Sequence, residues 1–377
     1  PDFLTLLHGV IDSPDIPLNV SRSYLQSDRN VKKISQYITK KVADRLNGIF
    51  KNDREQFEQK WDDLKLFIHY GILSEQDFYD KAKNFALLKD IEGKYYTYDE
   101  YREATKEAQT DKDGNLICLY TNDREAQFAH VEAATAKGYN VLLLDGQLDA
   151  PLVSELERKW EKTRFVRVDS DTVERLIQKD DKTVSEADEQ VRANLSTVFK
   201  TMLPKVEKVD FQVDATAMGE EAQPVVITQS EYMRRMKEMA QLQQGMAFYG
   251  EMPDMYSLVL NTDHRLVKQV NDELNTSLAD RLAPIDAELR GLNARRQAIE
   301  TAQQNTKSED LTEAEKADRK QVNDDIAAQE KLREEALADY ARTNKLVPQL
   351  IDLALLQNGL LRGEALNAFV KRSVELI

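Results

Sequence analysis

Apolar residues recur every three or four positions through the first part of the chain, which is the spacing of amphipathic helices. Between residues 27 and 88 this pattern predicts three helices that pack together as one unit. The third of them is expected over residues 74–88. The apolar faces of the first two are formed by Val31, Ile34, Ile38, Val42, Leu46 and Phe50, then by Phe57, Trp61, Leu64 and Ile68.

Residues 89–180 follow a different pattern, in which short apolar runs alternate with helical segments. The runs at 116–121, 139–145 and 165–169 are typical of strands. The helix between the first two ends before Gly138, a residue suited to a helix C-terminus, and the next helix has Pro151 in its first turn. Strands and helices in this order predict parallel βαβ connections, so we expect a small α/β subdomain.

A polar, acidic stretch at 181–196 is expected to be a linker that runs into a helix, and it places a domain boundary near residue 185. Beyond it, strands are predicted at 206–213, 224–229 and 256–261, with a helix over 230–245. The expected fold class is a multidomain α+β and α/β protein. Its parts are a strand-like piece with a loop at 1–26, a three-helix unit at 27–88, a small αβα domain at 89–180 and an α+β domain at 185–377.

Residues 274–343 are predicted to be a helical hairpin inserted into this last domain. Thr312 and Glu315 form a capping box that starts its second helix. Its first helix carries a stripe of Leu278, Leu282, Ile285, Leu289 and Leu292. Two interpretations stay open: a solvated structural arm, which the charged surroundings favour, and a dedicated binding device. We expect deletion of residues 276–341 to leave both dimerisation and the fold intact.

The last two helices carry apolar stripes at the end of the sequence, where such surfaces usually need a partner. We therefore expect a homodimer that forms through residues 344–377. The residues assigned to dimerisation are Leu350, Leu353, Leu356, Leu366, Phe369, Val370 and Val374.

The amino-acid composition limits the kinds of partner and location that we expect for this protein. The chain of 377 residues has a formal net charge of −15, which disfavours nucleic acid as a partner because phosphates need a basic surface. No apolar run is long enough to predict a membrane span, and the first residues resemble neither a signal peptide nor a natural start, so we expect a cytoplasmic fragment. Cys118 is the single cysteine, and its surroundings indicate a small buried hydrophobe rather than a reactive thiol.

The sequence lacks motifs for a metal site or for nucleophilic catalysis. Its four histidines, His8, His69, His130 and His264, are scattered and show no metal-ligand spacing. Neither a phosphate-binding glycine loop nor a nucleophile elbow occurs. The residues alone therefore favour an interaction protein over an enzyme, and a structural adaptor with a coiled-coil arm is one form of it.

The loop PLNVSRSYLQ at 17–26 places Arg22 one helical turn before Gln26. Arginine donates to phosphate oxygens in a fork geometry, and glutamine can orient a phosphate oxygen or a water. The pair is thus a candidate for contact with a phosphate, although an arginine before a helix is also an ordinary surface feature.

Tyr232, Met233, Met236 and Met239 recur at helical spacing within a methionine-rich stretch at 230–255. Flexible, polarizable methionine side chains suit a surface that binds many shapes. The alternative, which the residues alone favour, is that they fill the core of a domain.

The first 41 residues resemble the ninety-kilodalton heat-shock chaperone family of the bacterial HtpG type. The family pattern there is a strand, a loop and a helix. The matching positions are Gly9 to Ser13, Pro17 to Asn19, Ser21-Arg22 and Leu25-Gln26, with Ser23 where the family usually has glutamate. Weaker similarity continues at 101–109, 116–121, 230–239 and 260–267, whereas 274–343 has no counterpart in most relatives.

This resemblance implies that the chain is the later part of the chaperone's middle segment followed by its C-terminal dimerisation domain. It implies that 1–26 is the end of an αβα sandwich and that 185–377 is the α+β dimerisation domain. It implies that Arg22, Gln26 and Asn19 belong to a catalytic loop that reaches the γ-phosphate of ATP. In the family, ATP is bound with Mg in an N-terminal domain that this sequence does not contain. The fragment alone is therefore expected to hold no cofactor and not to hydrolyse ATP.

The resemblance also gives the methionine-rich helix a role. In the family, an amphipathic helix of the C-terminal domain contacts unfolded or partly folded client proteins. It implies that Tyr232 and Met236 are such contacts, with Met239 one turn farther along, and we assign Met233 to the same client-binding site. It also implies a protein of the stress response that assists protein folding.

Overall fold

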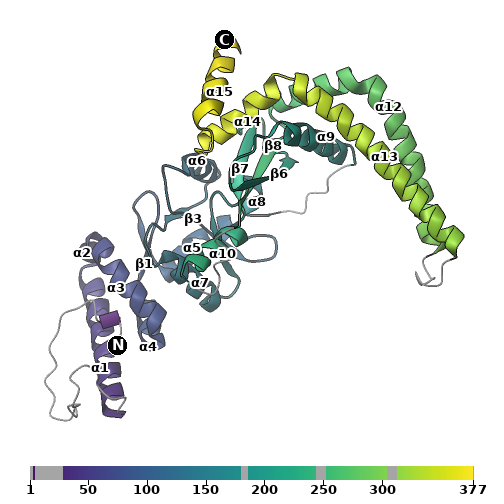
Figure 1. Ribbon diagram of the computed structural model, residues 1–377. Coiled ribbons are helices and arrows are strands. Elements are labelled where there is room, and N and C mark those ends of the chain that lie inside the picture. The colour runs from purple at the N-terminus through teal and green to yellow at the C-terminus, as the bar shows by residue number, and fades with distance from the viewer. Residues whose placement is uncertain (1–2, 5–28, 180–185, 243–251, 304–311, 377) are drawn as a thin grey trace. The chain divides into compact units, whose positions relative to one another are not determined.

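The computed structural model describes residues 3–4, 29–179, 186–242, 252–303 and 312–376 (Figure 1). The chain divides into two compact units, Pro1–Asp181 and Lys182–Ile377, and each is described by itself. Both combine helices with small sheets, so the mixed α and β fold class is confirmed. Among the described helices, none has both the length and the apolar content needed to cross a bilayer.

Over residues 29–88 the structure describes four helices, where the sequence predicted three. They are α1 (Arg29–Asn52), α2 (Arg54–Gln59), α3 (Trp61–Ser74) and α4 (Gln76–Ala82). The second predicted helix is divided at Lys60, whose backbone (φ −96°, ψ 2°) leaves the helical region. Asp53 caps the short α2 by accepting a hydrogen bond from the Gln56 amide at 3.0 Å. The third predicted helix ends at Ala82 because the chain then turns into strand β1 (Leu87–Lys89).

Aromatic side chains hold these helices together. Phe3, Phe57 and Phe78 are fully buried, and the rings of Phe3 and Phe78 lie 4.7 Å apart. Ring contacts of this kind add to the hydrophobic burial of the side chains. α1 contributes Ala43 and Leu46 to the same core, which fixes the helix against the rest of the unit.

The predicted parallel βαβ arrangement is confirmed in the sheet of the first unit. Its strands are β3 (Leu116–Thr121), β4 (Val141–Leu143) and β5 (Thr163–Arg167), which lie parallel in the order β4-β3-β5. Every residue of β3 is buried, as expected of a central strand covered on both faces. The helices that follow the three strands are α6 (Phe128–Ala136), α7 (Asp149–Lys159) and α8 (Val173–Leu176). Gly138 lies just beyond α6 with a φ of +78°, the conformation expected there.

A hairpin and one helix connect α4 to this sheet. β1 pairs antiparallel with β2 (Tyr95–Thr97), and α5 (Tyr98–Gln109) follows directly. Thr97 and Glu100 form a capping box at the start of α5. Arg54 of α2 donates to the two carboxylate oxygens of Glu100 at 2.6 and 2.8 Å, so this carboxylate joins the helical part of the unit to its α/β part.

The Arg54–Glu100 pair gives the first unit a pH-dependent contribution to stability. The hydrogen bonds from Arg54 lower the pKa of Glu100 to about 2, from an ordinary value of 4.5. A carboxyl whose folded-state pKa is depressed stabilises the fold above its unfolded-state pKa, and that contribution is lost as pH falls through the folded-state value. We expect Glu100→Gln to lower the free energy of unfolding at neutral pH by about 1 kcal/mol or less, because both side chains are partly exposed.

The difference between Glu100→Gln and wild type should shrink as pH falls from 4.5 toward 2. Urea unfolding at a series of pH values between neutral and about pH 3 measures it. Glu103→Gln is the matched control, because Glu103 lies on the same helix and pairs with Lys106 of that helix. A difference that persists unchanged in acid, or that does not exceed the control at neutral pH, contradicts the assignment.

The second unit is built on a three-stranded mixed sheet. Its strands are β6 (Val209–Thr216), β7 (Val225–Gln229) and β8 (Asp254–Asn261), in the order β6-β8-β7, with β6 parallel and β7 antiparallel to β8. α9 (Glu186–Met202) packs against β6, and α10 (Glu231–Leu242) follows β7. Much of the stretch expected to be a linker therefore belongs to α9, whose Leu195, Val198 and Phe199 are buried in the core.

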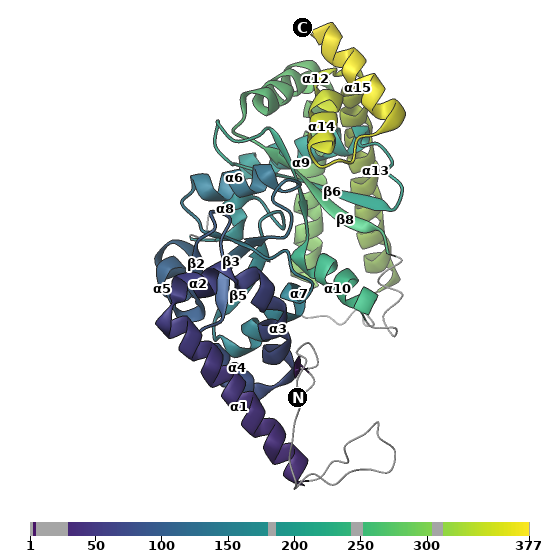
Figure 2. The ribbon, with the colours of Figure 1, turned by 90° about the vertical axis from the view of Figure 1, so that its left-hand side faces the viewer.

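Two long helices form the predicted hairpin, α12 (Arg265–Ala302) and α13 (Glu313–Thr343), which pack against each other (Figures 1 and 2). The capping box of Thr312 and Glu315 is confirmed. The hairpin has two separate apolar clusters. Near its base it joins the core of the unit through Leu274, Leu278, Leu282, Ala336, Leu337, Tyr340 and Ala341. Farther out it has a small core of its own, formed by Leu292, Val322 and Ile326.

The expectation that residues 276–341 can be deleted without harm is wrong for the base of the hairpin. Deletion removes Leu278, Leu282 and Tyr340 from a core that also includes α9 and the sheet. Truncating even one large buried side chain to alanine costs about 2–5 kcal/mol. Only the outer part, beyond Leu282 and before Ala336, can be removed without emptying this core.

Candidate functional site

α10 carries the residues predicted to contact client proteins. Tyr232 is 68% exposed, and Met233 and Met236 are partly buried. Neither methionine belongs to the described core of the second unit. The side chain of Met239 lies outside the described residues. The described part of α10 therefore presents an aromatic ring beside two methionines.

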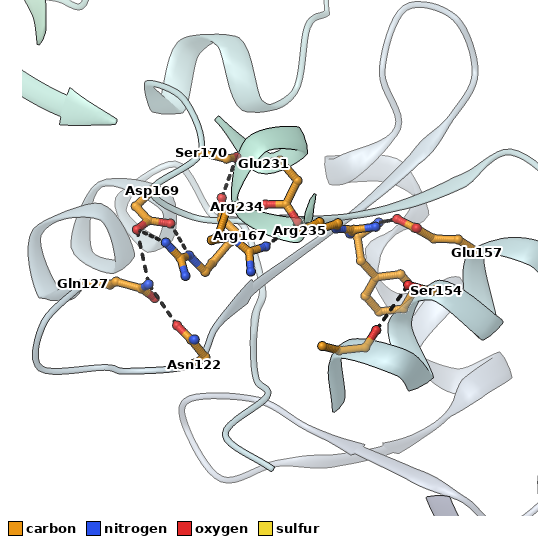
Figure 3. A network of polar contacts seen from close by, with 12 residues as sticks. Asn122, Gln127, Ser154, Glu157, Arg167, Asp169, Ser170, Glu231, Arg234 and Arg235 are labelled. Atoms are coloured by element: carbon orange, nitrogen blue, oxygen red, sulfur yellow. Dashed lines mark hydrogen bonds and ion pairs between the residues drawn. The ribbon is translucent and has the colours of Figure 1, made fainter. Parts of the chain in front are cut away.

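Ion pairs fix the polar side of α10. Glu231 accepts hydrogen bonds from Arg234 at 2.5 Å and from Arg235 at 2.6 Å (Figure 3). Burial alone would raise the pKa of Glu231, but the two arginines outweigh it and hold the pKa below its ordinary value. Lys237 pairs with Asp254, the first residue of β8, at 2.6 Å. The contacts of Glu231 lie within α10, whereas the pair of Lys237 and Asp254 joins the helix to β8.

The last two helices, α14 (Leu346–Gln357) and α15 (Gly363–Leu376), carry the residues assigned to dimerisation. Leu350 is buried in the core of its own unit, and Leu366 and Phe369 pack against that core. The exposed members of the set are Leu353 at 47%, Leu356 at 39%, Val370 at 49% and Val374 at 69%. The apolar surface open to a partner is therefore smaller than the stripes predicted.

Two polar contacts fasten α15 to α14. Gln349 donates to the Ser373 hydroxyl at 2.7 Å, and Arg372 pairs with Asp352. Burial raises the pKa of Asp352 despite the arginine. No side chain of residues 363–374 is fully buried, so α15 depends on these contacts and on half-buried apolar packing to hold its place.

The candidate phosphate-contacting residues Arg22, Gln26 and Asn19 lie outside the described residues. Their assignment to a catalytic loop therefore stays a prediction. It rests on the resemblance of the surrounding sequence.

A polar network follows the carboxyl ends of β3 and β5, the edge at which α/β sheets usually bind ligands. Arg167 donates to the two oxygens of Asp169 at 2.5 and 2.8 Å. Gln127 donates to Asp169 at 3.3 Å and to Asn122 at 3.0 Å (Figure 3). These groups satisfy one another, which is the arrangement of a structural network.

His69 and Asp149 form a buried pair that no sequence spacing revealed. Nδ1 of His69 lies 3.2 Å from Oδ1 of Asp149, and each residue is 5% exposed. The other oxygen of Asp149 accepts a hydrogen bond from the Gly146 amide at 2.7 Å. A cavity of about 120 Å³ adjoins the pair, and Lys65 and Lys89 also line it. Within the described ranges, metal-ligating side chains do not gather in groups of three, so we assign this pair to fastening α3 to the start of α7.

The expected role of Cys118 as a buried hydrophobe is confirmed. The residue is fully buried on β3. Burial raises the pKa of its thiol far above the ordinary value, which suppresses the reactive thiolate.

In the described part of the second unit, α10 exposes an aromatic ring, and α14 and α15 expose apolar side chains. The family model described as Hsp90 protein matches residues 1–289, and the chain belongs to that family. The resemblance found in the first 41 residues is thereby confirmed. The match ends inside α12, so Leu292, Val322 and Ile326 of the hairpin's outer core lie beyond it.

Two curated relatives match the chain over its whole length, and a third matches part of it. It is 58% identical to "Chaperone protein HtpG" of Bacteroides thetaiotaomicron and 52% identical to that of Porphyromonas gingivalis, and each match covers 100% of this chain and 55% of the relative. The HtpG of Frankia casuarinae is 30% identical over 217 residues, which are 55% of this chain and 32% of that protein. The chain thus spans about half the length of the first two relatives.

Proposed function

We propose that this chain is the middle and C-terminal part of an ATP-dependent molecular chaperone that binds unfolded or partly folded client proteins. The observation that carries the proposal is the exposed ring of Tyr232 beside Met233 and Met236 on α10. An aromatic ring with flexible thioethers accommodates apolar segments of many shapes, as a protein with varied clients requires. Membership of the Hsp90 protein family supports it.

ATP hydrolysis enters this proposal through the loop of Arg22, Gln26 and Asn19. In the full-length protein, ATP with Mg is bound by a domain outside this sequence. Arg22 then supplies positive charge where negative charge builds on the transferred phosphoryl group, and Gln26 supports it from the same loop. The chain alone lacks a nucleotide-binding motif, so we propose that it does not hydrolyse ATP by itself.

The protein acts, in this proposal, as a cytoplasmic homodimer joined through α14 and α15. The exposed apolar side chains Leu353, Leu356, Val370 and Val374 support this arrangement. Apolar surface of this kind is stabilised when a second copy covers it.

The client-binding helix is tested by replacing Tyr232 and Met236 with serine. We expect the double variant to need about tenfold more protein for equal suppression of aggregation, because losing the burial of two apolar side chains costs about 1–3 kcal/mol of binding. Light scattering from a denatured model protein, diluted in the presence of the chain, measures the effect.

Tyr37→Ser is the matched control, because Tyr37 on α1 is 61% exposed and has no assigned role. Equal suppression by the double variant and this control removes α10 from client binding. Absence of suppression by the wild-type chain favours the rival function, a structural adaptor whose coiled-coil arm is α12 with α13.

A further inference from the structure

The burial of side chains along the hairpin of α12 and α13 is interrupted between its two apolar clusters. The buried residues of the base core end at Leu282 on α12 and at Ala336 on α13. Those of the outer core begin at Leu292 and Ile326, and the partly buried Leu289 packs against this outer core. Between these levels, at residues 283–291 and 327–335, no side chain is buried. Helices in proteins are held in place mainly by packing an apolar face, so this stretch does little to fix the direction of the outer hairpin.

Pro284 lies within this unpacked stretch, inside α12. Proline has no amide hydrogen, so the carbonyl of Asp280, four residues earlier, loses its helical hydrogen bond, and the proline ring crowds that carbonyl. Sharp bends in helices occur at such positions. The point at which the backbone of α12 is weakest therefore coincides with the end of its packing against the unit.

Arg333 of α13 provides a polar link at the same level. Its Nε donates to Asp286 of α12 at 2.8 Å, and its Nη2 donates to Asn194 of α9 at 2.5 Å. Asn194 is buried and also accepts a hydrogen bond from Gln190 at 3.0 Å, so it is a fixed anchor. A link between a few polar groups can break and form again without unfolding a core.

We propose that the described residues 285–303 and 312–332 form an arm that pivots at Pro284, and that Arg333 is a clasp, a polar link that holds the arm in one of its orientations. The outer core and the ion pair between Arg295 and Asp318 keep the two helices of the arm together while it moves. This motion changes the distance between the end of the arm and the sheet, while the sheet and the terminal helices stay in place. It does not depend on client binding by α10.

Pulsed electron paramagnetic resonance on the full chain tests the pivot. One pair of spin labels joins the arm to the sheet, at Thr301→Cys and Asp210→Cys, and a control pair lies within the arm, at Thr301→Cys and Glu330→Cys. All three sites are exposed, whereas the native Cys118 is buried and stays unlabelled. Diluting labelled protein with unlabelled protein removes distances between copies.

We expect the arm-to-sheet distances to be more broadly distributed than those within the arm. Pro284→Ala restores the amide and should narrow the arm-to-sheet distribution, and Arg333→Ala should broaden it, with the exposed Lys331→Ala as the matched control. An arm-to-sheet distribution as narrow as the control pair, or one that Pro284→Ala leaves unchanged, overturns the pivot. An Arg333→Ala variant that matches Lys331→Ala overturns the clasp.

Discussion

Arg22→Ala, made in the full-length chaperone to which we assign this segment, is expected to slow ATP hydrolysis on the order of 10³-fold, the effect of arginines in comparable phosphoryl-transfer sites. The affinity for ATP should change little. Only interactions that are stronger in the transition state than in the ground state accelerate the chemical step. Arg22 is proposed to meet charge that develops during transfer, so its loss should appear in turnover and not in binding.

Single-turnover hydrolysis, measured beside nucleotide affinity, separates these two effects. Arg22→Lys should restore activity only in part, because lysine offers a point charge instead of a fork of donors. In the present chain, Arg22→Ala should change the free energy of unfolding by about 0.5 kcal/mol or less, as surface substitutions usually do. Normal turnover with normal ATP affinity in Arg22→Ala would show that the loop only positions domains. Normal turnover with weaker ATP binding would show that Arg22 contacts ATP in the ground state and does not stabilise the transition state.

The parallel sheet of the first unit could be predicted because its signals are local. A strand buried on both faces is apolar along its whole length, and Gly138 marks the end of the next helix. The division of the second helix at Lys60 could not be predicted in the same way. The apolar spacing of Phe57 and Trp61 runs across it without interruption, and both side chains are buried whether or not the helix is continuous.

Periodicity shows which face of a helix is buried but not what covers that face. Leu282 and Leu292 belong to one stripe of α12, yet the first lies in the core of the unit and the second in the separate core of the arm. Leu350 and Leu353 likewise share the predicted partner stripe, yet Leu350 is 3% exposed and Leu353 is 47% exposed. Only the three-dimensional packing distinguishes them.

In the candidate site, too, features set by nearby residues could be predicted from the sequence, and features set by distant residues could not. The methionine spacing of α10 was visible in the sequence, whereas the exposure of Tyr232 depends on how the helix lies against β8. The pair of His69 and Asp149 joins residues far apart in the chain, on α3 and α7, so no spacing rule could find it.

Dimerisation should fail when charge is placed on the exposed apolar side chains of the last two helices. We expect Leu353→Asp with Val374→Asp to weaken self-association by about 100-fold or more, since desolvating even one unpaired carboxylate costs several kcal/mol and about 3 kcal/mol corresponds to that factor. Removing residues 344–377 is a poorer test, because it also takes Val347, Leu350 and Ile351 out of the core of the unit.

Sedimentation over a range of concentrations measures the association, and circular dichroism establishes that the variant keeps its helices. Leu332→Asp is the matched control, because Leu332 on the arm is 47% exposed, as is Leu353, and lies outside the terminal helices. If the double variant and this control associate equally well, the terminal helices are not the interface. If only the double variant dissociates and its helix content is kept, the exposed faces of α14 and α15 are what the second copy covers, and the buried Leu350 contributes by holding α14 in position.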